Sequence, residues 1–459
     1  MKYSSNIIDI SEKIKNQCGD TFRDRIVETI YKRAEEISNS VVTNNKKTDF
    51  DKKVDDVLTS KAFGIPLMLV LLGIVFYITI TGANYPSELI AKFLFWGEDK
   101  LTELFTSMNS PAWLHGVLVL GLYRTLAWVV SVMLPPMAIF FPLFTLLEDL
   151  GYLPRVAYNL DHLFKKACAH GKQALTMCMG FGCNAAGIIA CRIIESPRER
   201  LVAILTNNFV PCNGRFPSLI AISSIFIAAS FSSKYGSLIA SLSVVVIVII
   251  GVSVTLLISY LLSKTLLKGE PSFFILELPP YRKPQIGRVV YTSIIDRTVF
   301  VLGRAAAFAA PAGAITWILG NIYIGDLSII AYISNILEPF GHALGLDGFI
   351  IMAFLLGFPA NEIVLPILVM SYLSAGSMVD FGNLDALKNI LISHGWNFIT
   401  AINFMLFSLL HFPCGTTLWT IKKETGSIKW TLISAILPTL VAIIVCFIIA
   451  QASRLFGII

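Results

Sequence analysis

Charged residues are scarce in this sequence, and this scarcity excludes several classes of protein at once. Only 14% of the 459 residues are charged, whereas 55% are hydrophobic; a soluble globular chain carries about 25% charge. The charges also gather at one end, because residues 1–60 hold 22 of the 66. The composition excludes a soluble enzyme, a secreted disulfide scaffold and a disordered chain, and it argues against a nucleic-acid binder. It predicts a membrane protein preceded by a short water-facing segment.

Several chemical signatures are missing as well. No CxxC pair occurs, and most of the eight cysteines lie in or beside apolar runs, so reduced thiols are predicted in place of disulfides. The first thirty residues contain no apolar leader, and the first membrane segment is expected to serve as the insertion signal. The sequence has no HExxH motif and no GxxxxGK[ST] phosphate loop. The chain is therefore predicted to bind no nucleotide and not to be an enzyme.

The apolar part of the chain reads as a series of membrane segments. Residues 64–81 carry no charge and are long enough to cross a hydrocarbon core about 30 Å thick. Lys52, Lys53 and Lys61 precede them, which places the N-terminus on the cytoplasmic side. Residues 86–107 are amphipathic and are expected to form an interfacial helix on the outer face. Further apolar runs are expected at about 112–134, 135–153, 173–191, 201–230, 236–262, 299–322, 327–340, 348–373, 390–413 and 430–451.

A polar stretch divides these runs into two halves. Residues 263–298 hold six basic and three acidic side chains, so the stretch is expected to be cytoplasmic. We predict an all-α polytopic protein of the inner (cytoplasmic) membrane with about ten membrane segments, counting re-entrant segments together with spanning ones. Its expected regions are a cytoplasmic amphipathic helical segment at 1–60, a first membrane half at 61–262, the linker at 263–298 and a second membrane half at 299–459.

The N-terminal segment is predicted to be helical and soluble. Ile26, Ile30 and Ile37 recur at helical spacing, and charged residues fill the gaps between them. Two interpretations stay open for this segment. It is a solvated extension of the membrane part, or it is a docking surface for a partner protein.

The two membrane halves repeat one another weakly. The string GFGCN at 180–184 corresponds to GFPAN at 357–361, and PCNG at 211–214 corresponds to PCG at 413–415. An arginine and a proline precede each first motif, Arg124 with Pro135 and Arg304 with Pro311. Glycine or proline inside an apolar run breaks the helix and frees backbone groups that lipid cannot satisfy. Paired breaks of this kind in two halves point to a transport site, although glycine and proline also serve simple helix packing.

The side chains near the two breaks suit a transition-metal ion. Thiol, thioether, imidazole and carboxylate groups favour a divalent first-row metal over Mg²⁺ or Na⁺. A charged residue inside an apolar run is costly and is a functional candidate for that reason; the alternative is an ion pair of Glu362 with Arg215 or Arg304. Each cysteine taken alone is more often a small core residue than a ligand. The candidate metal-contacting residues are Met179, Cys183, Asn184, Cys212, Asn361, Glu362 and Cys414.

From about Asp55 to the C-terminus, the sequence resembles the membrane domain of the ferrous iron transport protein B (FeoB) family. The strongest matches are MGFGCNAAGIIACRIIESPRERL (179–201), NNFVPCNGRFP (207–217), GFPANEIVLPIL (357–368) and FPCGTTLWTIKKETGSIKW (412–430). The resemblance implies two gate-containing repeats. It matches Cys183 and Cys212 to gate-side cysteines, Cys414 to a late cysteine and Glu362 to the glutamate of the second gate motif. Asn361 departs from the family, which often has lysine there.

The resemblance implies that the chain transports Fe²⁺ through the lipid bilayer. Members of the family normally begin with a G domain, which is absent from this sequence. Two interpretations stay open: a separate G-domain protein is a partner of this chain, or the gene is truncated. A small FeoA-like accessory protein and a homo-oligomer are further expectations, and no nucleic acid is expected. Two alternatives stay open: a non-transporting membrane regulator, and a carrier of another divalent metal or of a nucleoside. Aromatic side chains around the breaks would favour the nucleoside.

Overall fold

The structure is a computed structural model that describes residues 22–41, 48–60, 63–227, 236–268, 281, 283–379 and 384–457. The chain divides into two compact units, the first ending at Val57 and the second beginning at Leu58. The N-terminal part is helical, as predicted, and contains α2 (Phe22–Val41) and α3 (Thr48–Leu58). In α2 an ion pair joins Lys32 to Glu28 at 2.9 Å, the i,i+4 spacing that supports an exposed helix.

The second unit is almost entirely helical. Its first half contains α4 (Gly64–Ser107), α5 (Ala112–His115), η1 (Gly116–Tyr123), α6 (Arg124–Asp149), α7 (Tyr152–Lys166), α8 (Gln173–Gly182), α9 (Asn184–Ala190), η2 (Cys191–Ile193), α10 (Pro197–Thr206), η3 (Asn207–Phe209), α11 (Phe216–Ile222), η4 (Ser223–Ile227) and α12 (Gly236–Lys264). Its second half contains α13 (Ile286–Thr292), η6 (Ser293–Val299), α14 (Phe300–Asn321), β1 (Tyr323–Ile324), β2 (Leu327–Ser328), α15 (Ile329–Ala343), α16 (Gly348–Leu356), η7 (Asn361–Ile363), α17 (Val364–Tyr372), α18 (Leu384–Ser393), α19 (Phe398–Leu410), α20 (Gly415–Thr425) and α21 (Ile428–Leu455).

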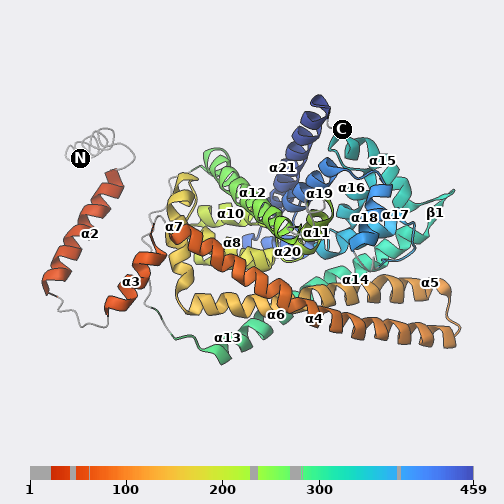
Figure 1. Ribbon diagram of the computed structural model, residues 1–459, viewed down its shortest axis with the longest axis horizontal. Helices are drawn as coiled ribbons and strands as arrows, with labels where there is room; N and C mark the ends of the chain where they lie inside the picture. The colour runs from red at the N-terminus through yellow and green to blue at the C-terminus, as the bar shows by residue number, and fades with distance from the viewer. Residues whose placement is uncertain are drawn as a thin grey trace, which may run out of the picture. The chain divides into compact units, whose positions relative to one another are not determined.

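Fewer helices are long enough to cross a membrane than the predicted ten. Among the described residues six helices are long and apolar enough, and a seventh span results if α15 and α16, bent by 111°, are counted together. The count of ten is therefore not confirmed. The apolar runs at 173–191, 201–230 and 348–373 contain short helices, because glycine, proline and extended residues interrupt them. These short helices lie among the longer ones (Figure 1).

The first membrane helix is longer than predicted. Residues 86–107 do not form a separate interfacial helix; they continue α4, whose 44 residues extend about 66 Å at 1.5 Å per residue. This is about twice the thickness of a hydrocarbon core. Pro86 lies inside the helix, and packing of α4 along α6 supports the continuous helix on both sides of the proline. The prediction failed because amphipathic composition does not show where a helix stops.

The internal repeat is visible in the backbone. A π-helix precedes α6 and another precedes α14, so α6 begins at Arg124 and α14 at Phe300, 176 residues later. Pro135 and Pro311 lie at the same place in the two helices. The two helices pack antiparallel, because η1 at the start of α6 contacts α14 and the remainder of α6 contacts η6. Antiparallel packing of equivalent helices is the arrangement of an inverted repeat.

Glycine permits the close approach of these two helices. A Cβ atom on Gly313 of α14 would lie 2.1 Å from Oγ1 of Thr125 and 2.4 Å from the carbonyl oxygen of Gly121. The backbones therefore approach more closely than any other residue would allow, as is common for helices in membranes. The contact holds the two repeats together beside the short helices that form the candidate site.

Candidate metal site between the two helix breaks

Both predicted breaks are present, and they have the same backbone conformation. Between α8 and α9, Cys183 is extended with φ −156° and ψ 126°. Between α16 and η7, Ala360 is extended with φ −152° and ψ 120°. Each is followed by a buried asparagine, Asn184 or Asn361. GFGCN and GFPAN are therefore similar in backbone structure as well as in sequence.

The second motif of each half closes the break of the same half. The amide of Asn213 donates a hydrogen bond of 3.4 Å to the carbonyl of Gly182, and the amide of Gly415 donates one of 2.9 Å to the carbonyl of Phe358. A carbonyl freed by a helix break needs such a donor, because lipid has none. The two motifs of each repeat thus act as one structural unit.

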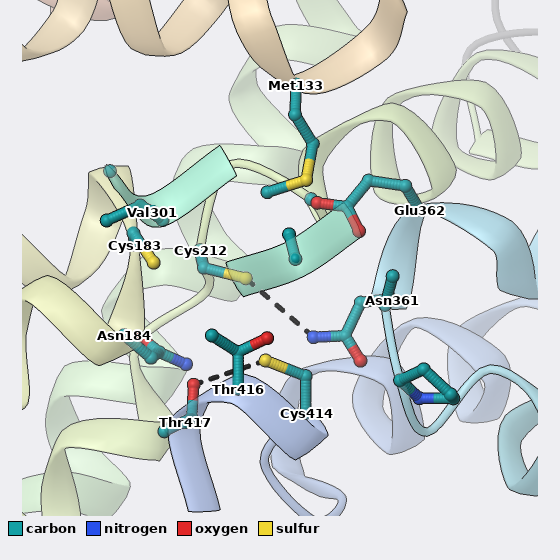
Figure 2. Close-up of a pocket in the computed structure, with 15 residues that line it drawn as sticks. Met133, Cys183, Asn184, Cys212, Val301, Asn361, Glu362, Cys414, Thr416 and Thr417 are labelled. Carbon is teal, nitrogen blue, oxygen red and sulfur yellow. Dashed lines mark hydrogen bonds between the residues drawn. The ribbon is translucent and has the colours of Figure 1, made fainter. Parts of the chain in front are cut away.

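The two units face each other across a small buried cavity (Figure 2). The cavity measures about 30 Å³, which is room for one or two water molecules. The predicted residues on its wall are Cys183, Asn184, Cys212, Asn361, Glu362 and Cys414. Pro359 and Ala360 of the second break also line it, and sequence reasoning did not single out Met133, Val301, Ala305, Thr416 and Thr417. Both threonines directly follow the late Pro-Cys-Gly motif. This position next to a motif is the feature of the sequence by which they could have been predicted.

Three of the chemical groups lie at the starts of helices. Cys183 is the N-cap residue of α9, Cys414 is the N-cap residue of α20, and Glu362 lies in the first turn of η7. The N-terminus of a helix carries partial positive charge and favours an anionic neighbour. A thiolate and not a thiol is the form that binds a metal ion. The helix starts therefore offset part of the cost of burying the anionic form that cysteine and glutamate need as ligands.

Hydrogen bonds orient two of the thiols. The amide nitrogen of Asn361 lies 3.8 Å from Sγ of Cys212, a contact between the two repeats. Sγ of Cys414 lies 3.2 Å from Oγ1 of Thr417. Figure 2 shows both contacts and shows Glu362 and Met133 on the opposite side of the cavity from Cys414. The thiols therefore have polar neighbours and are not merely small residues in an apolar core.

Glu362 is buried and forms no ion pair with a described residue. Its residue is 8% exposed, and among the described residues neither Arg215 nor Arg304 forms an ion pair with it. The predicted alternative, a structural ion pair, is not what this part of the chain shows. Gly214 makes room for the carboxylate, because a Cβ atom there would lie 2.0 Å from Oε1 of Glu362.

Arg215 joins the two repeats from behind the cavity. It is 1% exposed, and its guanidinium donates to the carbonyls of Asn208 at 3.0 Å and Leu409 at 2.7 Å, with longer contacts to those of His411 and Phe412. These last carbonyls belong to the end of α19, where helix geometry leaves them without partners. A buried arginine at the negative end of a helix is favourable. Arg215 therefore anchors the second Pro-Cys-Gly motif to the first half.

Other candidates lie elsewhere. Met179 does not line this cavity; it lines a larger one beside it, because the break at Cys183 turns the chain away from the preceding helical face. Met133 of α6 takes the expected place of the thioether. His411 places Nδ1 3.0 Å from the carbonyl of Phe407, the backbone contact expected of a structural histidine. Within the described residues no three His, Cys, Asp or Glu side chains form a ready metal-binding group.

Two family profiles match parts of this chain. A family profile described as Gate, nucleoside recognition, matches residues 130–226, which include the first break and the first Pro-Cys motif. A second, described as ferrous iron transport protein B C terminus, matches residues 244–296. The chain is similar to the FeoB family over most of its length.

Curated relatives match nearly the whole chain. The Fe(2+) transporter FeoB of Methanocaldococcus jannaschii is 30% identical over 94% of this chain and 63% of its own length. The protein of the same description from Staphylococcus aureus strain MSSA476 is 29% identical over 92% of this chain and 62% of its own length. A Fe(2+) transport protein A/Fe(2+) transporter FeoB fusion protein of Porphyromonas gingivalis is 26% identical over 88% and 52%. The chain spans about three fifths of the length of the first two relatives.

Proposed function

We propose that this chain carries Fe²⁺ across the membrane through the cavity between its two helix breaks. The observation that carries the proposal is the convergence of Cys183, Cys212, Cys414 and Glu362 on one buried cavity. These residues come from four segments and both repeats. The FeoB relatives, described as Fe(2+) transporters, support the same substrate.

The chemistry of the wall suits a transported ion better than a stored one. Three thiols and one carboxylate are ligands for a borderline divalent metal, with oxygens of Asn184 and Asn361 as further contacts. Since the side chains line the cavity without forming a closed ligand set, the ion has to rearrange them when it enters and leaves. Binding requires loss of thiol protons, so each ion that binds releases protons. Fe²⁺ is not favoured over Zn²⁺ by affinity alone, and selectivity therefore rests on geometry and supply.

The cysteine cavity is too small to hold a nucleoside. Pockets for organic ligands measure about 300–1,000 Å³, whereas this cavity measures about 30 Å³. No aromatic side chain lines it within the described residues. Of the three phenylalanines near the breaks, Phe181 and Phe209 are buried in the hydrophobic core, and Phe358 lines a different cavity. A metal ion is the cargo that fits the wall.

We further propose the predicted arrangement in the cell. The chain lies in the inner membrane with its N-terminus and the linker at 263–298 in the cytoplasm, because basic loops stay on that side. The regions 1–60, 61–262, 263–298 and 299–459 serve as docking segment, first half, linker and second half. A GTPase supplied as a separate chain and a small FeoA-like protein are its proposed partners, the second supported by the fusion relative. The chain itself binds no nucleotide.

Fe²⁺ uptake by proteoliposomes containing the purified chain tests the proposal. Wild-type protein should take up Fe²⁺, and the triple variant Cys183→Ser, Cys212→Ser, Cys414→Ser should lose uptake while keeping its thermal unfolding midpoint within a few degrees. Serine preserves the size and removes the soft ligand.

The matched control is Cys446→Ser. Cys446 is also fully buried, but it lies in α21 and contacts the carbonyl of Asn403 at 3.5 Å, away from the cavity. Uptake should survive this change. Equal uptake by the triple variant and the wild type would exclude the cysteines as ligands. Absence of uptake by wild-type protein, both alone and with an added GTPase partner, would favour the non-transporting regulator.

A further inference from the structure

A second, larger cavity of about 580 Å³ lies beside the cysteine cavity, and Val301 lines both. Its wall combines apolar and charged side chains. The apolar ones include Phe144, Leu175, Met179, Ile189 and Phe300, and the charged ones are Glu148, Arg192, Arg304, Lys423 and Glu424. We propose that this cavity binds the phosphate group of an anionic phospholipid between Arg304 and Lys423, with an acyl chain against the apolar wall.

The charge of the wall favours an anion. Arg192 and Glu424 neutralise each other through two hydrogen bonds of 2.8 and 2.6 Å. Among the described residues, Arg304 and Lys423 form no ion pair. Arg304 instead places its guanidinium 4.1 Å from the ring centre of Phe300. Together these two cations outweigh Glu148, so the wall attracts a negative group and repels a divalent cation.

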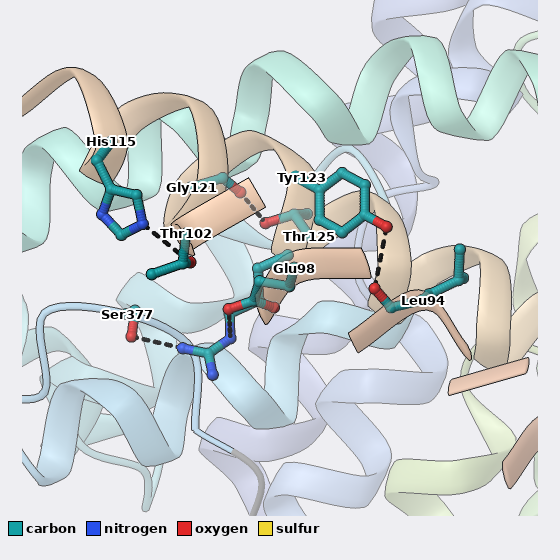
Figure 3. A network of polar contacts seen from close by, with 9 residues as sticks. Leu94, Glu98, Thr102, His115, Gly121, Tyr123, Thr125 and Ser377 are labelled. Carbon is teal, nitrogen blue, oxygen red and sulfur yellow. Dashed lines mark hydrogen bonds and ion pairs between the residues drawn. The ribbon is translucent and has the colours of Figure 1, made fainter. Parts of the chain in front are cut away.

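The first repeat also has an arginine near the start of its long helix, and the neighbours of that arginine show how its charge is compensated. Arg124 is the first residue of α6. Arg304 lies one helical turn after the start of α14. Nε of Arg124 lies 3.3 Å from Oε1 of Glu98, which is buried, and its Nη1 donates to Oγ of Ser377 at 2.8 Å. Figure 3 draws the contacts to Glu98 and to Ser377 as dashed lines.

No carboxylate takes the place of Glu98 in the second repeat, within the residues that the structure describes. A charged group in a membrane helix is costly without a counter-charge. The first repeat supplies the counter-charge from its own chain, and in our proposal the lipid phosphate supplies it beside Arg304. A phosphate carries the opposite charge, and two of its oxygens can accept hydrogen bonds from the planar guanidinium of arginine.

The surroundings select a lipid over free phosphate. Phe300 and Ile193, which line the cavity, are 53% and 42% exposed, so the cavity opens onto apolar surface. Phe300 begins the α14 part of a helix of membrane-spanning length. Basic pockets between membrane helices are known to take anionic headgroups, and free phosphate would leave the apolar wall without a partner.

Thermal unfolding of the detergent-solubilised chain with added lipid tests the proposal, because a ligand of the folded state raises the unfolding midpoint. Phosphatidylglycerol should raise the midpoint of wild-type protein, and phosphatidylcholine should do so much less. Inorganic phosphate should have no effect. The apparent affinity for phosphatidylglycerol should fall about 30-fold in Arg304→Gln, Lys423→Gln, since each basic residue contributes about a factor of five.

The control variant is Lys422→Gln, Lys429→Gln. These lysines lie near the rings of Trp419 and Trp430 and do not line the cavity, so the double variant removes the same charge and should respond like wild type. Lys423→Gln alone changes an exposed residue and tests the site should the Arg304 variant fail to fold. The proposal would be overturned if phosphatidylcholine or inorganic phosphate stabilised the wild-type protein as much as phosphatidylglycerol does. It would also be overturned if phosphatidylglycerol stabilised the two double variants equally.

Discussion

The two helix breaks share a backbone and differ in chemistry. Cys183 in the first break and Ala360 in the second have φ and ψ within about 6° of each other. The positions after them hold Asn184 and Asn361 in both repeats, but the next residue is alanine in the first and Glu362 in the second. The first break therefore supplies a thiol and the second a carboxylate. Duplication explains the shape of the cavity, and divergence of two positions explains its mixed set of ligands.

The second motifs differ in the same complementary way. Residues 211–215 and 413–417 correspond at a spacing of 202 residues, so Thr417 stands where the first half has Arg215 and Thr416 stands opposite Gly214. Arg215 reaches across to the end of α19, whereas Thr417 contacts Cys414 of its own half. The first half therefore holds the second in place, and the relation is not reciprocal. Such asymmetry is what a repeat acquires when one half anchors and the other supplies charge.

The largest effect should come from removing the charge of the second break. Glu362→Gln keeps the shape and removes the only carboxylate on the cavity wall among the described residues. Fe²⁺ uptake in proteoliposomes should fall about 100-fold, equivalent to about 2.7 kcal/mol, with an unchanged unfolding midpoint. A variant that is destabilised yet transports normally per folded molecule would mean that Glu362 is structural. In that case the free energy of unfolding should fall by about 3–5 kcal/mol, as expected when a buried ion pair is broken.

The next effect should come from moving that carboxylate without changing its charge. In Gly214→Ala the new methyl group occupies the position of Oε1 of Glu362, and the flexible side chain has to move. Uptake should fall about tenfold, at a stability cost of about 1–3 kcal/mol typical of overpacking. Gly415→Ala is the control from the other half, because its Cβ atom would only touch the rings of Phe308 and Phe358 at 3.3 Å. Equal losses in both variants would show that the effect is on packing and not on Glu362.

A swap between the breaks should have a smaller net effect. Cys183→Ala should weaken Fe²⁺ binding about tenfold, the effect of losing roughly 1.4 kcal/mol, as measured by equilibrium titration under anaerobic conditions. Adding Ala360→Cys restores a thiol at the equivalent position, which also lines the cavity and has the same backbone conformation. The double variant should recover affinity to within about threefold of wild type. Failure to recover any affinity would mean that the two breaks are not interchangeable at the ion.

The smallest effect on the ion should follow from changing the anchor. Lysine in place of Arg215 keeps the charge but cannot bond the carbonyls of Asn208 and Leu409 in the fork geometry of a guanidinium. The free energy of unfolding should drop by about 1–3 kcal/mol, the effect of leaving a buried acceptor without its donor. Denaturant titration of the purified protein measures this. Fe²⁺ affinity per folded molecule should change less than in Cys183→Ala; a larger change would place Arg215 at the ion itself.

Composition and motif spacing were enough to determine several features of this protein. The scarcity of charge predicted a membrane protein, and glycine and proline in the apolar runs predicted the two breaks, because these residues interrupt the helical hydrogen-bond ladder wherever they occur. The order GFGCN, PCNG, GFPAN, PCG predicted a repeat. Six of the seven candidate residues line one cavity, since the breaks that free backbone groups also bring their neighbouring side chains to the same place.

Only the tertiary structure decided what those features form together. Met179 and Met133 are both methionines in apolar helices, and only packing shows which of them lines the cysteine cavity. The apolar runs predicted about ten membrane segments, some of them re-entrant. Within the described residues six helices, or seven with the bent pair, are long enough to span, because an apolar run is equally stable in lipid and in a protein interior. Whether Glu362 and Arg215 would pair was likewise undecided until the fold placed the arginine on the carbonyls of α19. Contacts between side chains nearly 200 residues apart in the sequence depend on how the helices pack, and local sequence does not determine this packing.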